Sequence, residues 1–191
     1  MGRIEKLFND CWEFQVVGIN ENPDEEKYVE VRLPHDWLIY DCNNLYADGT
    51  GYYRKVFSLE KQDNKRYYIN FDGVYMDSTV YVNGSEAGVN RYGYSPFEYD
   101  ITGLLKNGEN EIKVEIRHKS PNSRWYSGAG IYRDVHFIEV NDLHIAPNGV
   151  YIYTECLSGK NSGDRGKWKV TADIEIAGDD PENIKDDLGF E

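Results

Sequence analysis

One stretch of the sequence, residues 120–133, combines residue types that can recognise a sugar. It reads SPNSRWYSGAGIYR and places Arg124, Trp125 and Tyr126 together among small, flexible neighbours. An aromatic face can stack on the C–H side of a sugar ring, and a guanidinium group can donate hydrogen bonds to hydroxyls. Loops of this content often bind ligands. Packing of Trp125 onto the body of its own domain would explain the same residues, and their chemistry alone does not separate the two interpretations.

The other reactive groups show no pattern of a catalytic or metal site. With 34 acidic residues, some pair of carboxylates must lie close together, so such a pair does not indicate a glycosidase centre. Ser127 precedes Gly-Ala-Gly but lacks the strand-to-helix elbow of a hydrolase nucleophile. The four histidines stand singly, without metal-site spacing: His35, His118, His136 and His144. We therefore expect structural or surface histidines, no catalytic residue, no metal and no cofactor.

Composition excludes several classes of partner. The formal net charge of −13 repels nucleic acid and anionic lipid, so we expect neither nucleic acid nor membrane as a partner. The three cysteines are far apart and lack the short paired spacing of a zinc or disulfide framework. The N-terminus has no apolar run of signal-peptide length, which favours a cytoplasmic protein, although a signal peptide removed before this point would leave the same sequence.

The elements that must position these residues are short β-strands. Apolar residues alternate with polar ones in several runs, and Asn83-Gly84 and Asn107-Gly108 provide the positive φ angles of tight turns. Residues 101–105 allow one helical turn at most. The runs that predict half-buried strands are Tyr67, Ile69 and Phe71; Val80 and Val82; and Ile112, Val114 and Ile116. The sequence therefore predicts an all-β fold, with two antiparallel sheets packed as a jelly-roll β-sandwich.

We expect residues 1–141 to form this sandwich and residues 142–191 to begin a second domain. Trp168, Val170, Ala172, Ile174 and Ile176 alternate on one face of a further strand. Two strands bury too little apolar surface to be stable alone, so this part is expected to be incomplete. A hairpin docked on the first domain would explain the same residues.

Five segments, taken in order and spacing, resemble the N-terminal, galactose-binding-like jelly-roll domain of family-two glycoside hydrolases, in particular β-galactosidases. The resemblance covers most of residues 5–141, and residues 142–191 are similar to the start of the immunoglobulin-like domain that follows. The segments are RLPHDW (32–37), DGTGYYRKVF (48–57), FDGVYMDSTVYVNG (71–84), YGYSPFEYDIT (92–102) and SRWYSGAGIYRDV (123–135).

The resemblance implies a larger enzyme whose TIM barrel carries both catalytic glutamates of a retaining glycosidase. In that family the jelly roll lends side chains to the sugar pocket at the barrel mouth. The implied partners are a β-galactoside-type carbohydrate and the catalytic barrel of the same full-length chain, and residues 1–191 alone would not catalyse hydrolysis.

The resemblance also implies particular sugar contacts. Asp48 stands where the β-galactosidase branch has Asn or Asp before the Gly-Tyr pair. The second candidate contact is the loop with Arg124, Trp125 and Tyr126, but this chain has Ser123 and Arg124 where some relatives place an Asp. Arg124 could donate to a sugar hydroxyl or pair with an acidic residue of the barrel. We interpret residues 32–37 as a structural corner.

Two other functions fit the same sequence, a free-standing carbohydrate-binding module and a purely structural domain. The sequence leaves the choice between galactoside, glucuronide and mannoside open. A shared pocket requires the loops bearing Asp48 and Trp125 to lie at the same end of the sandwich.

Overall fold

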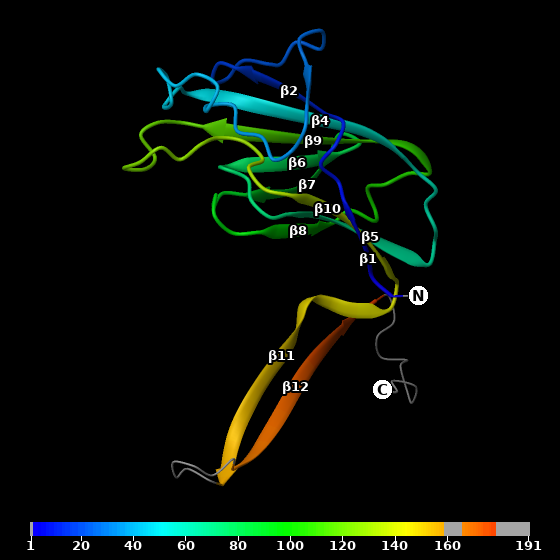
Figure 1. Ribbon diagram of the computed structural model, residues 1–191. Helices are drawn as coiled ribbons and strands as arrows, with labels where there is room; N and C mark the ends of the chain where they lie inside the picture. Colours follow the sequence, from blue (N-terminus) through cyan, green and yellow to red (C-terminus); the bar gives the residue numbers. More distant parts are fainter. Residues whose placement is uncertain (1, 159–165, 179–191) are drawn as a thin grey trace. The chain divides into compact units, whose positions relative to one another are not determined.

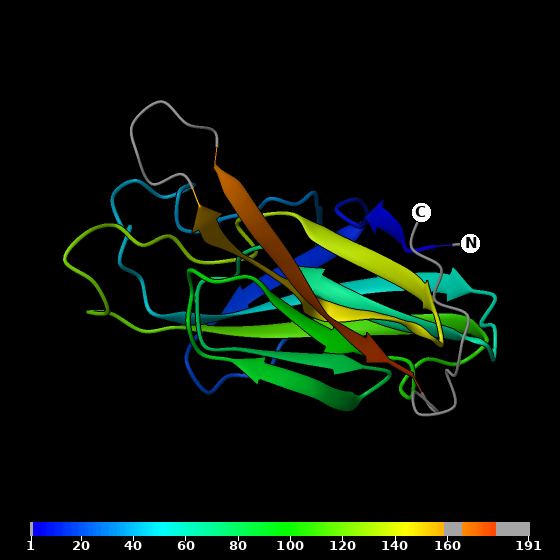
Figure 2. The same cartoon turned by 90° about the horizontal axis from the view of Figure 1, so that it is seen from below.

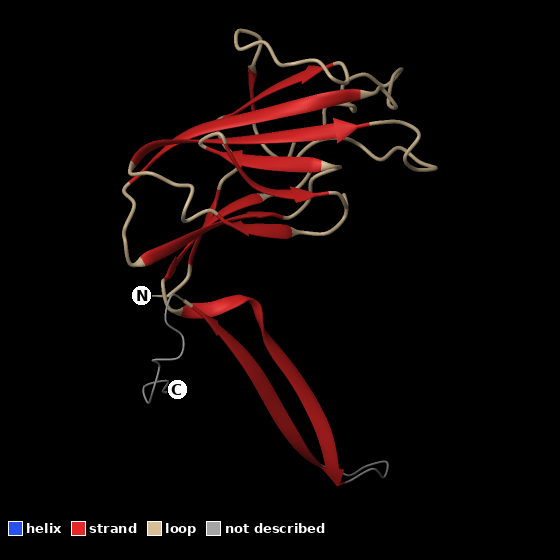
Figure 3. Cartoon of the chain, turned by 180° about the vertical axis from the view of Figure 1, so that it is seen from behind, coloured by secondary structure: helices blue, strands red, loops and turns tan. Residues whose placement is uncertain are grey.

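The computed structural model describes residues 2–158 and 166–178. Every regular element within these residues is a β-strand, which confirms the all-β prediction (Figure 3). No helix in the described part of the chain is long and apolar enough to cross a bilayer. The chain divides into two compact units, the first ending at Glu139 and the second starting at Val140.

The first unit is a sandwich of two sheets (Figure 1). The six-stranded sheet has the order β3 (Val29–Val31), β2 (Trp12–Val17), β4 (Gly49–Leu59), β9 (Gly108–His118), β6 (Ser78–Val82) and β7 (Ser85–Asn90). The four-stranded sheet has the order β1 (Ile4–Leu7), β10 (Val135–Asn141), β5 (Lys65–Phe71) and β8 (Phe97–Asp100).

The core lies between these sheets and uses the apolar faces that alternation predicts. The residues predicted on β5, β6 and β9 are all fully buried. Asn83 and Gly84 have φ angles of 50° and 81° and connect β6 to β7 in the predicted tight hairpin. Residues 101–105 form a single turn, in which the Leu105 amide donates to the carbonyl of Ile101 at 3.1 Å.

The pairing of β4 with β9 decides which loops meet. These strands are antiparallel over their full length, and Gly49, the first residue of β4, pairs with His118, the last of β9. The segment before β4 and the segment after β9 therefore emerge side by side. Figures 1 and 2 show both loops at the same end of the sandwich.

The second unit contains one antiparallel pair, β11 (His144–Ser158) and β12 (Lys167–Ala177). The predicted alternation on β12 is confirmed, because Ile174 pairs with Val150 and Ala172 with Ile152 on one apolar face. Ile152 and Val170 on this face are exposed to 62% and 65%. The immunoglobulin-like assignment of residues 142–191 and its incompleteness both stay predictions.

Candidate functional site

The two loops predicted to contact sugar are joined at their bases. Oδ1 of Asp48 accepts a hydrogen bond of 2.6 Å from the backbone amide of Ser120. The buried imidazole of His118 lies between the loops, with Nδ1 2.8 Å from the carbonyl oxygen of Ala47 and Nε2 3.5 Å from Oγ of Ser127. The condition for a shared pocket is therefore met in the first unit.

Asp36 fixes the loop that carries Trp125. Its Oδ1 accepts hydrogen bonds of 3.0 Å from the backbone amides of Leu38 and Ala129, and its Oδ2 accepts one from the hydroxyl of Tyr126. Gly128 has a φ of 70°, and a Cβ there would lie 2.6 Å from Oδ2 of Asp36. Only glycine therefore allows this close approach. Through Asp36, the segment 32–37 shapes the second loop as well as its own corner.

The three candidate side chains of this loop differ in what they can offer. Burial and the hydrogen bond to Asp36 raise the pKa of Tyr126 well above its usual range, so its hydroxyl stays a neutral donor committed to Asp36. Trp125 is 80% exposed, which decides against packing onto its own sandwich. Arg124 is exposed and forms no ion pair with any other residue of the described ranges. Arg124 and the ring of Trp125 are thus available to a ligand or a partner.

Tyr92 and Tyr94 extend the exposed surface at this end, and the sequence predicted neither as a site residue. They are connected to the loop of Trp125 through the buried Tyr75. The hydroxyl of Tyr75 donates to Oδ1 of Asn122 at 3.3 Å, which ties Tyr75 to the loop of Trp125. The ring of Tyr94 lies 5.3 Å from that of Tyr75, and Tyr92 lies 5.8 Å from Tyr94. Tyr92 and Tyr94 are more than half exposed. Their segment, YGYSP, carried part of the family resemblance but no motif that marks a ligand contact.

A packed aromatic group supports the corner at residues 33–37. Nδ1 of His35 lies 2.7 Å from the hydroxyl of Tyr53, and the ring of Phe14 lies 4.7 Å from the imidazole and stacks on Trp37 at 5.4 Å. Burial lowers the pKa of His35, although the Asp36 carboxylate opposes the shift. His35 is therefore a neutral structural residue near pH 7, as expected.

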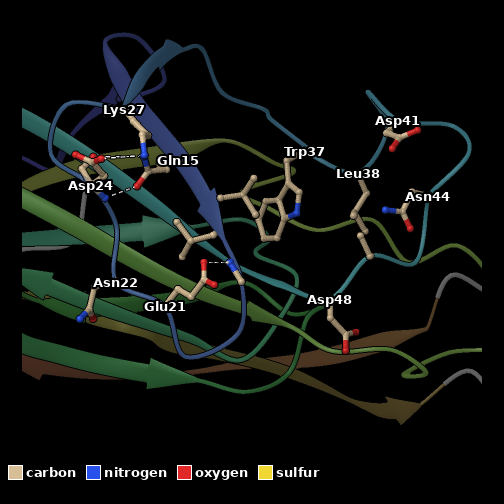
Figure 4. A pocket seen from close by; sticks show the side chains of 14 residues that line it. Gln15, Glu21, Asn22, Asp24, Lys27, Trp37, Leu38, Asp41, Asn44 and Asp48 are labelled. Carbon is tan, nitrogen blue, oxygen red and sulfur yellow. Dashed lines mark hydrogen bonds and ion pairs between the residues drawn. The ribbon is translucent and has the colours of Figure 1, made fainter.

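A hollow of about 570 Å³ opens beside Asp48, where β2 continues beyond its pairing with β3 (Figure 4). We call it the β2-edge pocket. Its lining comprises Gln15, Val16, Val17, Gly18, Glu21, Asn22, Asp24, Lys27, Trp37, Leu38, Asp41, Asn44, Ala47 and Asp48. Sequence reasoning did not predict this hollow, although it named Asp48, one of the lining residues, as a sugar contact.

One group of possible metal ligands departs from the expectation of isolated histidines. Ligand atoms of Asp72, Asp134 and His136 lie within 4.8 Å of one another. Nε2 of His136 is 3.4 Å from Asp72, and its Nδ1 is 3.2 Å from Glu5. Asp134 accepts a hydrogen bond of 2.7 Å from Asn9. Each of the three residues thus has a partner within the first unit.

Comparison with known proteins identifies the family of this chain. A family model described as glycosyl hydrolases family 2, sugar binding domain, matches residues 10–141. The chain belongs to glycoside hydrolase family 2. The matched range covers β2 to β10 and includes both candidate loops.

Relatives and solved structures agree with this assignment. A β-galactosidase of Bacteroides ovatus is 43% identical over 68% of this chain, and a putative β-glucuronidase of Formosa agariphila is 37% identical over 92%. The crystal structure of a β-glycosidase from Bacteroides vulgatus superposes with a TM-score of 0.76, at 31% identity over 92% of this chain and 24% of that chain. The chain spans 17% and 18% of the two curated relatives. It therefore contains the sugar-binding sandwich of much longer glycosidases.

Proposed function

We propose that this chain is the N-terminal accessory domain of a β-galactosidase-like retaining glycosidase, in which it completes the substrate pocket of a catalytic TIM barrel. Asp48, Arg124 and the ring of Trp125 supply contacts to the substrate. Tyr126 orients the loop that carries Arg124 and Trp125. The catalytic glutamates are expected in that barrel. The observation that supports this role is the joining of both loops at one end of the sandwich, with Trp125 and Arg124 left exposed.

The choice of a galactoside rests on two observations. The β-galactosidase of Bacteroides ovatus is 43% identical over 143 residues, whereas the putative β-glucuronidase of Formosa agariphila is 37% identical over a longer stretch of 192 residues. The chain also carries a net charge of −13, which disfavours an anionic sugar acid over a neutral sugar.

The test uses the full-length enzyme and a chromogenic β-galactoside. Replacing Trp125 by Ala is expected to lower kcat/KM by about tenfold, because the loss of a stacking contact is worth about 1 kcal/mol or more. Asp63→Ala serves as the control, since Asp63 is an exposed carboxylate in the turn before β5. Unchanged kinetics in Trp125→Ala would favour a purely structural domain.

A pair of substitutions at position 48 tests the side-chain oxygen of Asp48. Asp48→Ala removes the acceptor of the Ser120 amide, whereas Asp48→Asn retains an oxygen at that place. We expect Asp48→Ala to lower kcat/KM and Asp48→Asn to keep most of the activity, because a carboxamide oxygen can still accept from the Ser120 amide and from a substrate hydroxyl. Unchanged kcat/KM in Asp48→Ala would exclude Asp48 as a contact to the substrate.

The exposure of Trp125 also favours a second candidate, a free-standing carbohydrate-binding module. Calorimetry of the isolated chain with galactose and lactose separates the two. A module is expected to bind at the Trp125 loop with a measurable enthalpy, whereas one wall of a shared pocket is expected to give little or none. Hydrolysis of a chromogenic glycoside by the isolated chain would contradict both.

A further inference from the structure

The charge of the β2-edge pocket is strongly one-sided. Its lining carries the carboxylates of Glu21, Asp24, Asp41 and Asp48 against one ammonium group, that of Lys27. Nζ of Lys27 is already 3.0 Å from Oδ2 of Asp24, and its hydrogen bond lowers the pKa of that carboxyl. At neutral pH the pocket therefore keeps a net negative charge, which repels an anionic ligand.

The uncharged polar groups of the pocket suit hydroxyls. Asn22 and Asn44 come from different loops, and both are exposed (Figure 4). Neither side chain hydrogen-bonds to another residue within 2–158 or 166–178. A carboxamide can both donate and accept, as a hydroxyl does, and a carboxylate accepts from a hydroxyl. The pocket thus offers partners to a polyol without requiring a charge on it.

An apolar wall completes the chemistry of a sugar site. Val16 is 45% exposed and the half-buried Trp37 projects among the lining side chains in Figure 4. The indole is held in place, because it stacks on Phe14 and lies where Gly51 has no side chain. The C–H face of a pyranose can pack on such a wall. A hollow of about 570 Å³ is within the usual size of small-molecule sites.

The pocket is formed before any ligand enters. The Gln15 amide holds the backbone of Asp24 through both of its polar atoms, at 2.7 and 3.3 Å. Glu21 accepts from the amide of Gly18 at 3.1 Å, and Asp41 accepts from that of Asn43 at 3.1 Å. Because the walls are already ordered, a ligand would lose little free energy in arranging them.

From these observations we infer that the β2-edge pocket is a second sugar subsite, selective for a neutral sugar residue over a uronic acid. The inference rests on the proposed function in taking a carbohydrate as the ligand, and the pocket shares Asp48 with the proposed substrate contacts. In this subsite, Asn22 and Asn44 hydrogen-bond to the sugar hydroxyls, and Trp37 and Val16 pack against the C–H face of the ring. The carboxylates of the pocket repel a negatively charged sugar.

The test is an NMR titration of the 191-residue chain with methyl β-D-galactopyranoside and, separately, methyl β-D-glucuronide. Concentrations up to about 50 mM would detect even a Kd of about 10 mM. We expect the amides of Asn22 and Asn44 and the indole N–H of Trp37 to shift with the galactoside. Binding of the glucuronide is expected to be weaker by about tenfold, because its carboxylate meets like charges.

Two sets of variants assign the signal to the pocket. Asn22→Ala combined with Asn44→Ala is expected to weaken galactoside binding by about tenfold, since both changes remove exposed hydrogen-bonding groups. Glu21→Gln combined with Asp41→Asn keeps both backbone acceptors but removes two charges, so the preference over glucuronide is expected to shrink.

A third variant distinguishes this inference from the proposed function. Arg124→Ala combined with Trp125→Ala alters the loop proposed to face the barrel and is expected to leave the pocket shifts unchanged. If this variant leaves kcat/KM of the full-length enzyme unchanged while the pocket still binds galactoside, the proposed function is contradicted and the subsite is not. Absence of shifts at Asn22, Asn44 and Trp37, equal binding of the glucuronide, or shifts confined to the Trp125 loop would each overturn the subsite.

Discussion

At the scale of single residues, Asp36 has an effect that its neighbourhood in the sequence does not reveal. Its carboxylate binds two backbone amides and the hydroxyl of Tyr126, a residue 90 positions away. Hydrogen bonds to a charged acceptor are stronger than neutral ones, and donors that lose the acceptor inside a protein are costly. Asp36 therefore links the corner at residues 33–37 to the loop of Trp125.

Replacing Asp36 by Ala is expected to lower the free energy of unfolding by about 2 kcal/mol, because the Ala129 amide loses its acceptor. Urea denaturation followed by tryptophan fluorescence measures the change. The matched variant Asp63→Ala alters an exposed turn carboxylate and is expected to stay within about 0.5 kcal/mol of the unsubstituted chain. Equal stability of the two variants would contradict the role of Asp36.

His35 predicts a pH dependence of stability. Burial lowers the pKa of His35 in the folded chain below its ordinary value of 6.5. As the pH falls below 6.5, the unfolded chain therefore takes up a proton that the folded chain does not, and stability falls until the pH passes the folded pKa. The contribution of His35 is fully present above this window.

The measurement compares urea denaturation at about pH 7.5 and pH 5.5 in the unsubstituted chain and in His35→Gln. Glutamine keeps a polar partner for the hydroxyl of Tyr53 but does not titrate. We expect the loss of stability on acidification to be smaller in the variant. An identical loss would show that other groups account for it.

At the scale of elements, β4 carries a position where the absence of a side chain is required. A Cβ at Gly51 would lie 2.5 Å from the ring of Trp37 and 3.1 Å from that of Phe14. Trp37 can therefore cover the strand and form a wall of the β2-edge pocket. Glycine in the middle of a strand is otherwise unfavourable, so its presence here has a packing cause.

Gly51→Ala is expected to destabilise the first unit by about 1–3 kcal/mol, because the indole must shift out of a packed position. Gly103→Ala is the control, since a Cβ there meets no atom within 4 Å. Thermal unfolding measures stability, and the near-ultraviolet circular dichroism of the tryptophans reports the displacement of Trp37. Unchanged spectra and stability in Gly51→Ala would contradict this packing.

The strands and turns were predictable, whereas the contacts among loops were not. Alternation over Ile112, Val114 and Ile116 and the pair Asn83-Gly84 act locally, so the sequence displays them directly. The pairing of Asp48 with Ser120 spans 72 positions and follows only once β4 and β9 are aligned. The motif resemblance pointed to the two candidate loops, whose contact with sugar stays a prediction, but not to the pocket beside β2.

At the scale of the whole molecule, the two units differ in how much core they contain. The buried core cluster of the first unit lies within residues 12–137. The second unit contributes β11 and β12, whose exposed residues include Trp168, Val170 and Ile152. The stability of the sandwich should therefore be independent of the hairpin.

A chain shortened to residues 1–141 is expected to unfold within about 2 °C of the 191-residue chain, because it retains the β1–β10 pairing and the complete core cluster. Differential scanning calorimetry measures the midpoint. A decrease of more than about 5 °C would show that the hairpin stabilises the sandwich.

The imidazole of His118 has one further consequence. The imidazole contacts the loop before β4 through Ala47 and the loop after β9 through Ser127. A displacement of one loop therefore changes the contacts of the other. Free-energy effects of substitutions add only when the sites are independent. Changes at Asp48 and Trp125 should therefore combine non-additively in their effect on stability.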